Sequence, residues 1–333
     1  MKLKKFLPLK FRRKFRDQME DLKRKFPSAM NGWPELGLEA TQIYPIGDNI
    51  RKSLQISLKK QFDGLIIKST TNTASLGTCF AEEFSSYIKR NKGKYLYKEA
   101  NRFNSSANWG RIYTIPNLHQ IVEYTLQSDY PIIIESCSRG FFDPLRDRSV
   151  GYYSSFQEAK DNISSHRMAS EMVFRDAEVL VITLGQNEAW IDTQNDKIWG
   201  NNPPSDIWKS QPKRFLPIEF SYLDNFNRLE AALLKLFLAN KNLKIIITVS
   251  PVAAYATFIA DNVVTQSFAG KCLLRSVVHD IIRKFPKQVY YFPSFEMVFC
   301  DNPYKFRSDN QHVKFKTVDE IFSVLSIATN NSV

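Results

Sequence analysis

The chain has 333 residues, of which 43% are hydrophobic, and a formal net charge of +12. This is enough apolar material for a large core, in one large domain or in one domain with additions. No apolar run is long enough to span a bilayer or to form the core of a signal peptide, so we expect a cytoplasmic protein. Its four cysteines show no Cys-x-x-Cys spacing and no histidine pairing, which predicts free thiols and no metal site.

The positive charge is concentrated at the start of the chain. Residues 1–26 contain 11 Lys and Arg against 3 Asp and Glu, whereas the remaining chain contains 35 against 31. Apolar residues recur at helical spacing between these cations, from Leu3 to Phe26. We expect a basic amphipathic arm that lies on an anionic membrane surface, or packs on its own domain or on a partner. No nucleic-acid-binding motif accompanies the charge, so nucleic acid is not an expected partner.

After the arm, the sequence predicts a connector and then alternating strands and helices. Proline and glycine punctuate the start of residues 27–72, which we expect to form an irregular connector packed on the main domain. Buried strands are expected at 73–76, 178–184, 244–249 and 288–292, with a fifth candidate at 131–135. Helical patterns lie at 81–92, 117–127, 155–175, 221–240, 266–285 and near 317–328. This alternation predicts an α/β domain over 73–330 with a parallel sheet covered on both faces.

One segment of this domain departs from the alternation. Residues 191–220 have little apolar periodicity and contain a loop-like stretch of turn residues. We expect a loop insertion there, long enough to act as a lid over a cleft.

Chemistry-bearing residues follow the predicted strands, where ligands bind in parallel sheets. Cys79 follows the first strand and precedes a helical pattern, whose dipole would favour its thiolate. Asp309 and His312 lie in the last loop, and Asp309 can hold one ring nitrogen of His312 while the other faces the nucleophile. The Asn187 amide and backbone N–H groups near Cys79 are candidate oxyanion donors.

Each of these residues also has an ordinary structural interpretation. A lone cysteine after a strand is more often a small core residue than a nucleophile. Three of the four histidines, His119, His166 and His279, fall inside helical patterns, where a structural role is expected. Together, however, the residues favour a covalent acyl-transfer site over a set of unrelated loop residues.

Several motifs resemble those of a known family. The stretch Gly77-Thr78-Cys79-Phe80-Ala81 resembles the signature of the GSCFA family, which is itself similar to SGNH/GDSL hydrolases. Further matching motifs follow in order: Asn108-Trp109-Gly110 with Tyr113 and Pro116, Thr183-Leu184-Gly185 with Glu188 and Trp190, Thr248-Val249-Ser250-Pro251-Val252, Leu274-Arg275, Tyr291-Phe292-Pro293-Ser294-Phe295-Glu296 and Asp309-x-x-His312. The resemblance covers about residues 73 to 315. It implies a flavodoxin-like, three-layer α/β/α sandwich with a central parallel sheet.

The resemblance also implies roles for individual residues. Cys79 falls where SGNH enzymes have their nucleophilic serine, and Asp309 and His312 match their Asp-x-x-His. Gly110 and Asn187 take the places of the oxyanion donors.

Neighbouring motif residues complete this implied site. Asn108 and Glu188 would help to bind the oxyanion or the substrate. Thr78 stands where GSCFA proteins usually have serine, which makes it the alternative nucleophile.

The resemblance implies an acyl-ester enzyme, an O-acyltransferase or an esterase, that works through an acyl-Cys79 intermediate. The Gly-x-Cys turn is also similar to that of a capsule-polysaccharide biosynthesis family thought to act as acetyltransferases with coenzyme A. This similarity implies a glycan or glycolipid substrate, acetyl-CoA as a candidate acyl donor, no resident cofactor and a place at the inner membrane surface. The competing function is a non-catalytic glycan- or partner-binding protein that has kept the fold.

Overall fold

The structure is a computed structural model that describes residue 14 and residues 40–45, 50–300 and 305–329. The predicted basic arm, apart from Lys14, lies outside the described residues, as does much of the predicted connector. The chain divides into two compact units, residues 1–57 and 58–333, and the second contains every strand described here.

The described part of the connector differs from its prediction. It contains a short 3-10 helix, η4 (Ala40–Gln42), and helix α2 (Ile50–Gln61), which begins in the first unit and ends in the second. We expected irregular structure up to residue 60. The α2 segment contains no proline or glycine, however, so nothing in its sequence opposes a helix.

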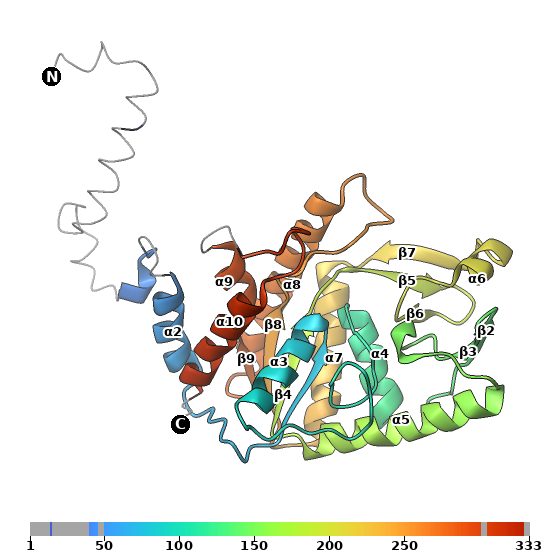
Figure 1. Cartoon of the computed structure of the whole chain (residues 1–333), viewed down its shortest axis with the longest axis horizontal. Coiled ribbons are helices and arrows are strands. Elements are labelled where there is room, and N and C mark those ends of the chain that lie inside the picture. Colours follow the sequence, from blue (N-terminus) through green and yellow to red (C-terminus); the bar gives the residue numbers. More distant parts are fainter. Residues whose placement is uncertain (1–13, 15–39, 46–49, 301–304, 330–333) are drawn as a thin grey trace, which may run out of the picture. The chain divides into compact units, whose positions relative to one another are not determined.

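The second unit is built on a four-stranded parallel sheet (Figure 1). Its strands lie in the order β1 (Thr73–Gly77), β4 (Val179–Leu184), β8 (Lys244–Val249) and β9 (Val289–Tyr291). All three pairings are parallel, and all four strands are buried along their length except at Lys244. Continuous burial is expected when helices cover both faces of a parallel sheet. The four strands lie where the apolar runs predicted them.

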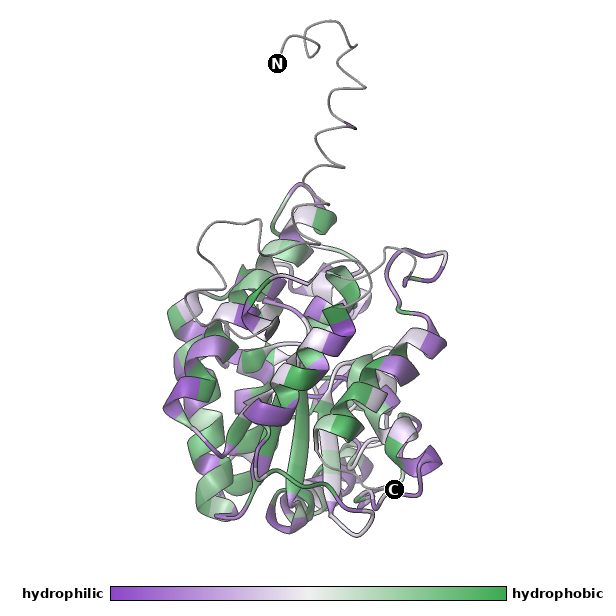
Figure 2. Ribbon diagram, turned by 90° about the vertical axis from the view of Figure 1, so that its left-hand side faces the viewer, coloured by the Kyte–Doolittle hydropathy of each residue, from purple (hydrophilic) through white to green (hydrophobic). Residues whose placement is uncertain are grey.

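Helices form a layer on each face of this sheet. Alternate strand residues, including Leu76, Ile182 and Ile247, share a core with three helices, α4 (Ile115–Leu126), α7 (Tyr222–Ala239) and α8 (Val263–Lys284). The long helix α5 (Phe156–Asp176) packs beside α4 and α7. Figure 2 shows the apolar strands in the interior and the hydrophilic residues gathered on the outer sides of the helices.

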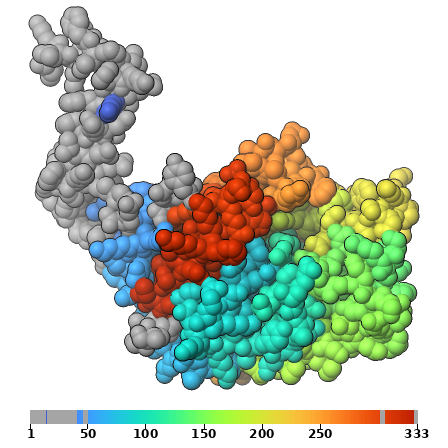
Figure 3. Space-filling view, viewed as in Figure 1, coloured from blue at the N-terminus to red at the C-terminus, as the bar shows by residue number. Residues whose placement is uncertain are grey.

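The opposite face is covered by α3 (Cys79–Arg90) and α10 (Phe315–Ala328). Ser75 of β1 points to this side, because its hydroxyl donates to the Ala81 carbonyl of α3 at 2.9 Å. The rings of Phe80 and Phe322 join the two helices, with centroids 4.9 Å apart. In Figure 3, α10 (red) lies directly against α3 (cyan). The result is the flavodoxin-like three-layer sandwich that the sequence predicted.

The segment predicted as a loop insertion is instead largely structured. It contributes to a three-stranded antiparallel sheet with the order β6-β5-β7, made of β5 (Glu188–Asp192), β6 (Lys197–Trp199) and β7 (Phe215–Glu219). A short helix, α6 (Ser205–Ser210), lies between β6 and β7. Trp199 and Phe215 form a separate small core with Phe142. These strands were missed because, unlike those of the parallel sheet, they are not continuous apolar runs.

Two smaller elements also depart from the sequence prediction. Residues 131–134 form no strand, and only Glu135 of the fifth candidate lies in one, the hairpin strand β2 (Glu135–Cys137), which pairs with β3 (Gly140–Phe142). The short helix α9 (Ser294–Phe299) was not predicted.

Within the described ranges, no helix has the length and apolar character needed to cross a membrane.

Candidate active site

Cys79 is the first residue of α3 and follows β1 through a turn that only glycine can make. Gly77 has a φ of +127°, and a Cβ atom there would lie 2.2 Å from the carbonyl oxygen of Thr183. Thr78 then caps the helix, because its hydroxyl accepts a hydrogen bond from the Phe80 N–H at 3.2 Å. The turn therefore places Cys79 at a helix N-terminus beyond the carboxyl end of β1.

The alternative nucleophile, Thr78, is occupied by these structural contacts. Its side chain is buried, and its hydroxyl is hydrogen-bonded to the Thr183 hydroxyl at 2.9 Å. The Thr78 N–H donates to the same Thr183 hydroxyl at 2.7 Å. Cys79, by contrast, is a free cysteine that is only partly buried. The geometry therefore favours Cys79 over Thr78 as the reacting group.

The Cys79 thiol lies among several charged groups. Burial raises its pKa, Arg111 opposes this rise, Glu82 and Glu83 of α3 add to it, and Lys271 opposes it. The pKa shift is opposite in direction to the one that the helix dipole alone would produce, and burial is its largest cause. The resting group is therefore a thiol, and attack by its sulfur requires a proton acceptor.

Arg111 and Tyr113 stand beside the thiol and were not identified as site residues from the sequence. The Arg111 Nε donates to Glu82 Oε1 at 2.8 Å, which fixes the guanidinium next to the first turn of α3. Burial raises the pKa of Tyr113 to about 12, and Arg111 opposes this rise. Tyr113 was matched only as part of the Asn108-Trp109-Gly110 motif and Arg111 was not matched at all, because no spacing rule connects either residue to Cys79.

Two backbone N–H groups, those of Cys79 and Gly110, are candidates for binding an oxyanion. Across the described parts of the chain, neither donates a hydrogen bond to the protein. Gly110 is buried and has a φ of +67°. Buried N–H groups are rarely left without an acceptor, so a ligand oxygen would satisfy them.

The loop that carries Gly110 is held by a buried polar network. The Asn108 N–H donates to Glu99 Oε2 at 2.8 Å, and the Asn108 carbonyl accepts from Arg146 at 3.2 Å. The same Glu99 oxygen lies 2.6 Å from Nδ1 of His166 on α5. His166 thus has the structural role expected of it. Asn108 contributes to the site through its backbone, which anchors the turn at Gly110.

Asp309 and His312 form the hydrogen-bonded pair that their spacing suggested. Nδ1 of His312 lies 2.8 Å from Oδ2 of Asp309, and the N–H groups of Gln311 and His312 each donate to Oδ1 at 2.9 Å. The backbone donors Gln311 and His312, together with the imidazole, lower the pKa of Asp309 to about 2. The pair is open to solvent, with 45% of the Asp309 side chain and 42% of the His312 side chain exposed.

Contacts on two sides connect this turn to the rest of the candidate site. The Gln311 side chain donates to the Ala253 carbonyl, in the loop after β8, at 2.8 Å. The Arg307 N–H donates to the His312 carbonyl at 2.7 Å. Burial raises the pKa of Glu83 in α3, and Arg307 opposes that rise, so the turn also interacts with α3. No hydrogen bond joins His312 to Cys79 within the described ranges.

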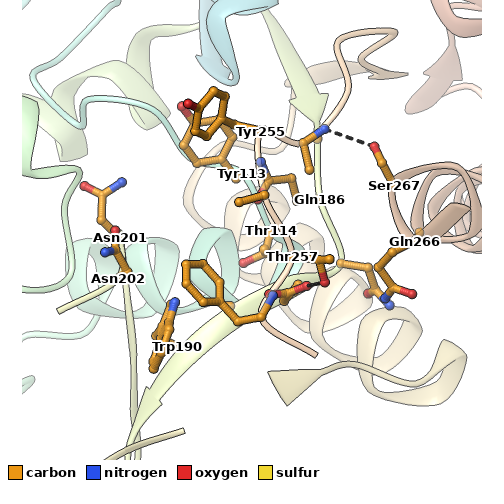
Figure 4. Close-up of a pocket in the computed structure, with 18 of the residues that line it drawn as sticks. Tyr113, Thr114, Gln186, Trp190, Asn201, Asn202, Tyr255, Thr257, Gln266 and Ser267 are labelled. Atoms are coloured by element: carbon orange, nitrogen blue, oxygen red, sulfur yellow. Dashed lines mark hydrogen bonds between the residues drawn. The ribbon is translucent and has the colours of Figure 1, made fainter. Parts of the chain in front are cut away.

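A cavity of about 450 Å³ opens between the loop after β4, the antiparallel sheet and the loop after β8 (Figure 4). Aromatic and amide side chains dominate its wall: Tyr113, Trp190, Trp199, Tyr255 and Phe258, with Asn117, Gln186, Asn187, Asn201, Asn202 and Gln266. In Figure 4, Trp190 and the Asn201–Asn202 pair lie across the cavity from Gln266. Glu188 is the one charged residue among the lining residues of the described chain.

Glu188 and Asn187 both line this cavity and both hold its wall together. The Glu188 carboxylate accepts from the Thr257 hydroxyl and from the Phe258 N–H, each at 2.7 Å. The Asn187 amide nitrogen donates to the Phe220 carbonyl at 2.7 Å, and its oxygen accepts from Asn225 at 2.7 Å. Asn187 therefore has little hydrogen-bonding capacity left for an oxyanion.

The cavity adjoins the turn that carries the thiol. A Cβ atom on Gly185, which lines the cavity, would lie 2.5 Å from the methyl group of Thr78. The N–H groups of Gly185 and Gln186 donate to the Tyr113 carbonyl at 3.0 and 2.9 Å. Cys79 is not itself among the lining residues, and neither is His312. The cavity thus lies next to the thiol and does not enclose it.

Among the described residues, no three His, Cys, Asp or Glu side chains are grouped so that they could hold a metal ion.

No curated protein matches the chain. The model of the GSCFA family matches residues 72–324, which include Cys79, Gly110 and the Asp309–His312 pair. This match extends over most of the chain and over all four strands of the parallel sheet. The chain belongs to the GSCFA family.

Proposed function

We propose that the protein is an acyl-transfer enzyme, either an O-acyltransferase or an ester hydrolase, that acts on a glycan through an acyl-Cys79 intermediate. The observation that carries this proposal is the position of Cys79. It begins α3 at the carboxyl edge of the sheet, where its own N–H and that of Gly110 have no protein acceptor in the described chain. A nucleophile with nearby unbonded N–H groups is the arrangement that acyl transfer requires.

The Asp309–His312 pair supplies the proposed acid and base. Asp309 holds Nδ1 of His312, which leaves Nε2 to accept the proton of the Cys79 thiol. The thiolate attacks the acyl carbonyl, and the oxyanion is held by the N–H groups of Cys79 and Gly110. The tetrahedral species then collapses, and the leaving group departs with the proton from His312. Movement of the exposed His312 side chain toward Cys79 is part of this proposal.

The second half of the reaction returns the enzyme to its resting state. A hydroxyl group, from water or from a sugar, gives its proton to His312 and attacks the thioester carbonyl. The new ester or acid forms as the C–S bond breaks, and the Cys79 thiolate takes the proton back from His312. The choice between water and sugar separates an esterase from an acyltransferase.

The cavity supports a glycan as the acceptor or the ester substrate. Sugar rings present apolar faces and a rim of hydroxyl groups, which match aromatic rings and amide side chains respectively. Acetyl-CoA remains the candidate acyl donor. Its phosphates would bind outside the cavity, because no cation lines the cavity in the described chain. No resident cofactor enters the proposed reaction.

The test is release of product from a simple acetyl ester by the full-length protein. We expect measurable turnover or a single burst with the wild type, loss of both in Cys79→Ala, and retention of both in Cys272→Ala. Cys272 is an exposed free cysteine and thus a matched control for non-specific thiol reactivity. Equal product release by the wild type and Cys79→Ala would contradict the proposal.

A second candidate function is glycan binding without turnover. It is favoured by the absence of a hydrogen bond between Cys79 and His312 in the described chain and by the exposure of the Asp309–His312 pair. This function predicts saturable binding of neutral oligosaccharides that is weakened in Trp190→Ala, together with no release of product from acetyl esters or acetyl-CoA.

We also propose that the basic arm holds the enzyme at the inner, anionic surface of a membrane, where glycolipids are available. The charge surplus in residues 1–26 supports this. Binding to vesicles that contain anionic lipid should be lost when residues 1–26 are deleted. Unchanged vesicle binding by the deletion variant would contradict it.

A further inference from the structure

Lys271 is a buried cation that the mechanism above does not use. It lies on α8 and only 2% of its surface is exposed. Its Nζ donates to the carbonyl oxygens of Gly185 at 3.0 Å and Ser250 at 2.7 Å. These residues directly follow the two central strands, β4 and β8. The amino group thus lies inside the protein, at the edge of the sheet where Cys79 also lies.

The surroundings of this amino group do not neutralise its charge. Buried ammonium groups are normally paired with a carboxylate, because removing an unpaired charge from water is costly. The two partners of the Lys271 Nζ in the described chain are neutral carbonyls. Burial lowers the pKa of Lys271 to about 7, and the charged group that opposes this shift is the Cys79 thiolate. The packing agrees with this. Gly185, whose carbonyl accepts from the Nζ, lies against Thr78, the residue before Cys79, since a Cβ atom on Gly185 would be 2.5 Å from the Thr78 methyl group. Lys271 therefore lies close to the turn that carries the proposed nucleophile.

The two hydrogen bonds of the Nζ leave one of its hydrogen-bonding positions unused. A neutral amine that donates to two carbonyls keeps a lone pair, whereas an ammonium group keeps a third N–H. A thiolate at Cys79 with an ammonium at Lys271 therefore has the same net charge as the resting thiol with an amine. Each charge favours the other, since Lys271 lowers the pKa of Cys79 and Cys79 raises that of Lys271.

We propose that Lys271 is a positioning residue for the nucleophile, whose buried amino group, when protonated, favours the thiolate form of Cys79. In the activated state, the proton of Sγ has passed to His312, and a Lys271 Nζ that carries its third proton stabilises the thiolate left behind. No electrons are exchanged, and no other reactant is required. This inference rests on the proposed role of Cys79 as the nucleophile.

Other charged groups also act on Cys79 and have to be separated from Lys271. Arg111 lies on the segment after Gly110, and Glu82 and Glu83 lie on α3 itself. Tyr113 also faces the thiol. Within the described chain, Cys79 is the one charged group that acts on the pKa of Lys271. A change at Lys271 therefore alters one known interaction of Cys79.

The test is the rate at which iodoacetamide alkylates Cys79 in the full-length protein, measured against pH by peptide mass analysis. Lys271→Met removes the charge, and we expect alkylation at pH 7 to fall about twofold or more and its midpoint to move to higher pH. Lys271→Arg keeps the cation, and its midpoint should move to lower pH. Lys284→Met is the matched control, because Lys284 lies at the end of the same helix in a surface ion pair with Glu230.

Cys272 provides an internal control in every sample. It is exposed and adjacent to Lys271, so an unchanged alkylation rate at Cys272 shows that α8 is intact. Identical pH profiles of Cys79 in the wild type and Lys271→Met, with Cys272 unchanged, would overturn the inference. This readout needs no acyl substrate, so it can fail while acyl transfer is retained, or succeed where no acyl transfer occurs.

A second measurement leaves Lys271 in place and so avoids the risk that its substitution unfolds the protein. The ¹³Cε chemical shift of Lys271 is followed against pH in lysine-labelled wild type and Cys79→Ala. Without the thiolate, the ammonium form loses its counter-charge, so the midpoint should move to lower pH in Cys79→Ala. Equal midpoints in the two proteins would overturn the inference.

Discussion

The hydroxyl groups of Thr78 and Thr183 lie 2.9 Å apart, and this contact joins the turn that carries Cys79 to the neighbouring strand β4. The Thr183 hydroxyl also accepts the Thr78 N–H at 2.7 Å. One side chain thus holds both the backbone and the hydroxyl of the residue that caps α3. The position of the thiol depends on this contact.

Replacing Thr183 by valine should therefore weaken both the fold and the site. The change keeps the shape of the side chain but removes the Thr183 hydroxyl, to which the N–H and the hydroxyl of Thr78 are both hydrogen-bonded. We expect a loss of about 1–3 kcal/mol in the free energy of unfolding, measured by chemical denaturation, and slower alkylation of Cys79. Thr193→Val is the matched control, since Thr193 is exposed. Similar losses in the two variants would contradict the role of the Thr78–Thr183 contact.

Gly77→Ala should be far more damaging than a similar change elsewhere. The added Cβ would lie 2.2 Å from a backbone oxygen that cannot move without distorting β4. Gly151 has a similar φ, +122° against +127°, but open space around it. We expect Gly151→Ala to cost on the order of 1 kcal/mol from backbone strain alone, and Gly77→Ala to lower the melting temperature much further. Equal melting temperatures would show that the close approach to Thr183 is not limiting.

The depressed pKa of Lys271 predicts how stability depends on pH. Below about pH 7 the folded protein carries the buried Lys271 charge, so the unfavourable free energy of burying that charge is fully present. Between about pH 7 and the pKa of an unfolded lysine near 10.4, the unfolded state binds the extra proton and stability rises with pH.

Comparison with Lys271→Met isolates this contribution. The free energy of unfolding of the wild type, relative to Lys271→Met, should increase by up to about 1.4 kcal/mol per pH unit above pH 7. Urea denaturation at a series of pH values measures it. If the difference in the free energy of unfolding between the two proteins stays constant from pH 6 to about pH 9, Lys271 is not a buried, titrating amine.

The Asp309–His312 pair should affect acyl transfer more than the reactivity of the thiol itself. Asp309→Asn removes the carboxylate that holds Nδ1, and we expect a loss of turnover of about tenfold or more, with alkylation of Cys79 little changed. The pair is exposed, so the fold should tolerate this change. Asp319→Asn, which removes a surface partner of Arg90 instead, is the control. Equal turnover in Asp309→Asn and Asp319→Asn would rule out a role for the pair.

The four parallel strands could be predicted because each is a short, continuous apolar run that is buried on both faces. The start of α3 could also be predicted, since the Gly77 turn and the Thr78 cap are local features. The antiparallel strands could not. Their cores depend on contacts such as Trp199 with Phe215 and Phe142, which join separate parts of the chain.

The pKa shifts in the site could not be predicted from the sequence either. Whether a cysteine at a helix start has a raised or a lowered pKa depends on burial and on residues distant in the chain, such as Arg111. Lys271 could have been noticed, because it falls on the same helical stripe as Leu274, Val278 and Ile281, all buried. A lysine on the apolar stripe of a helix is the signal that was missed.

The acyl-Cys79 intermediate is the central claim, and intact-mass analysis tests it most directly. Full-length wild type, Cys79→Ala and Cys272→Ala are incubated with a simple acetyl ester and, separately, with acetyl-CoA, and any modified peptide is then identified. The account predicts one acetyl group per chain on Cys79 in the wild type and in Cys272→Ala, and none in Cys79→Ala. Unmodified wild-type protein with both donors, or acetylation that persists in Cys79→Ala, would contradict it.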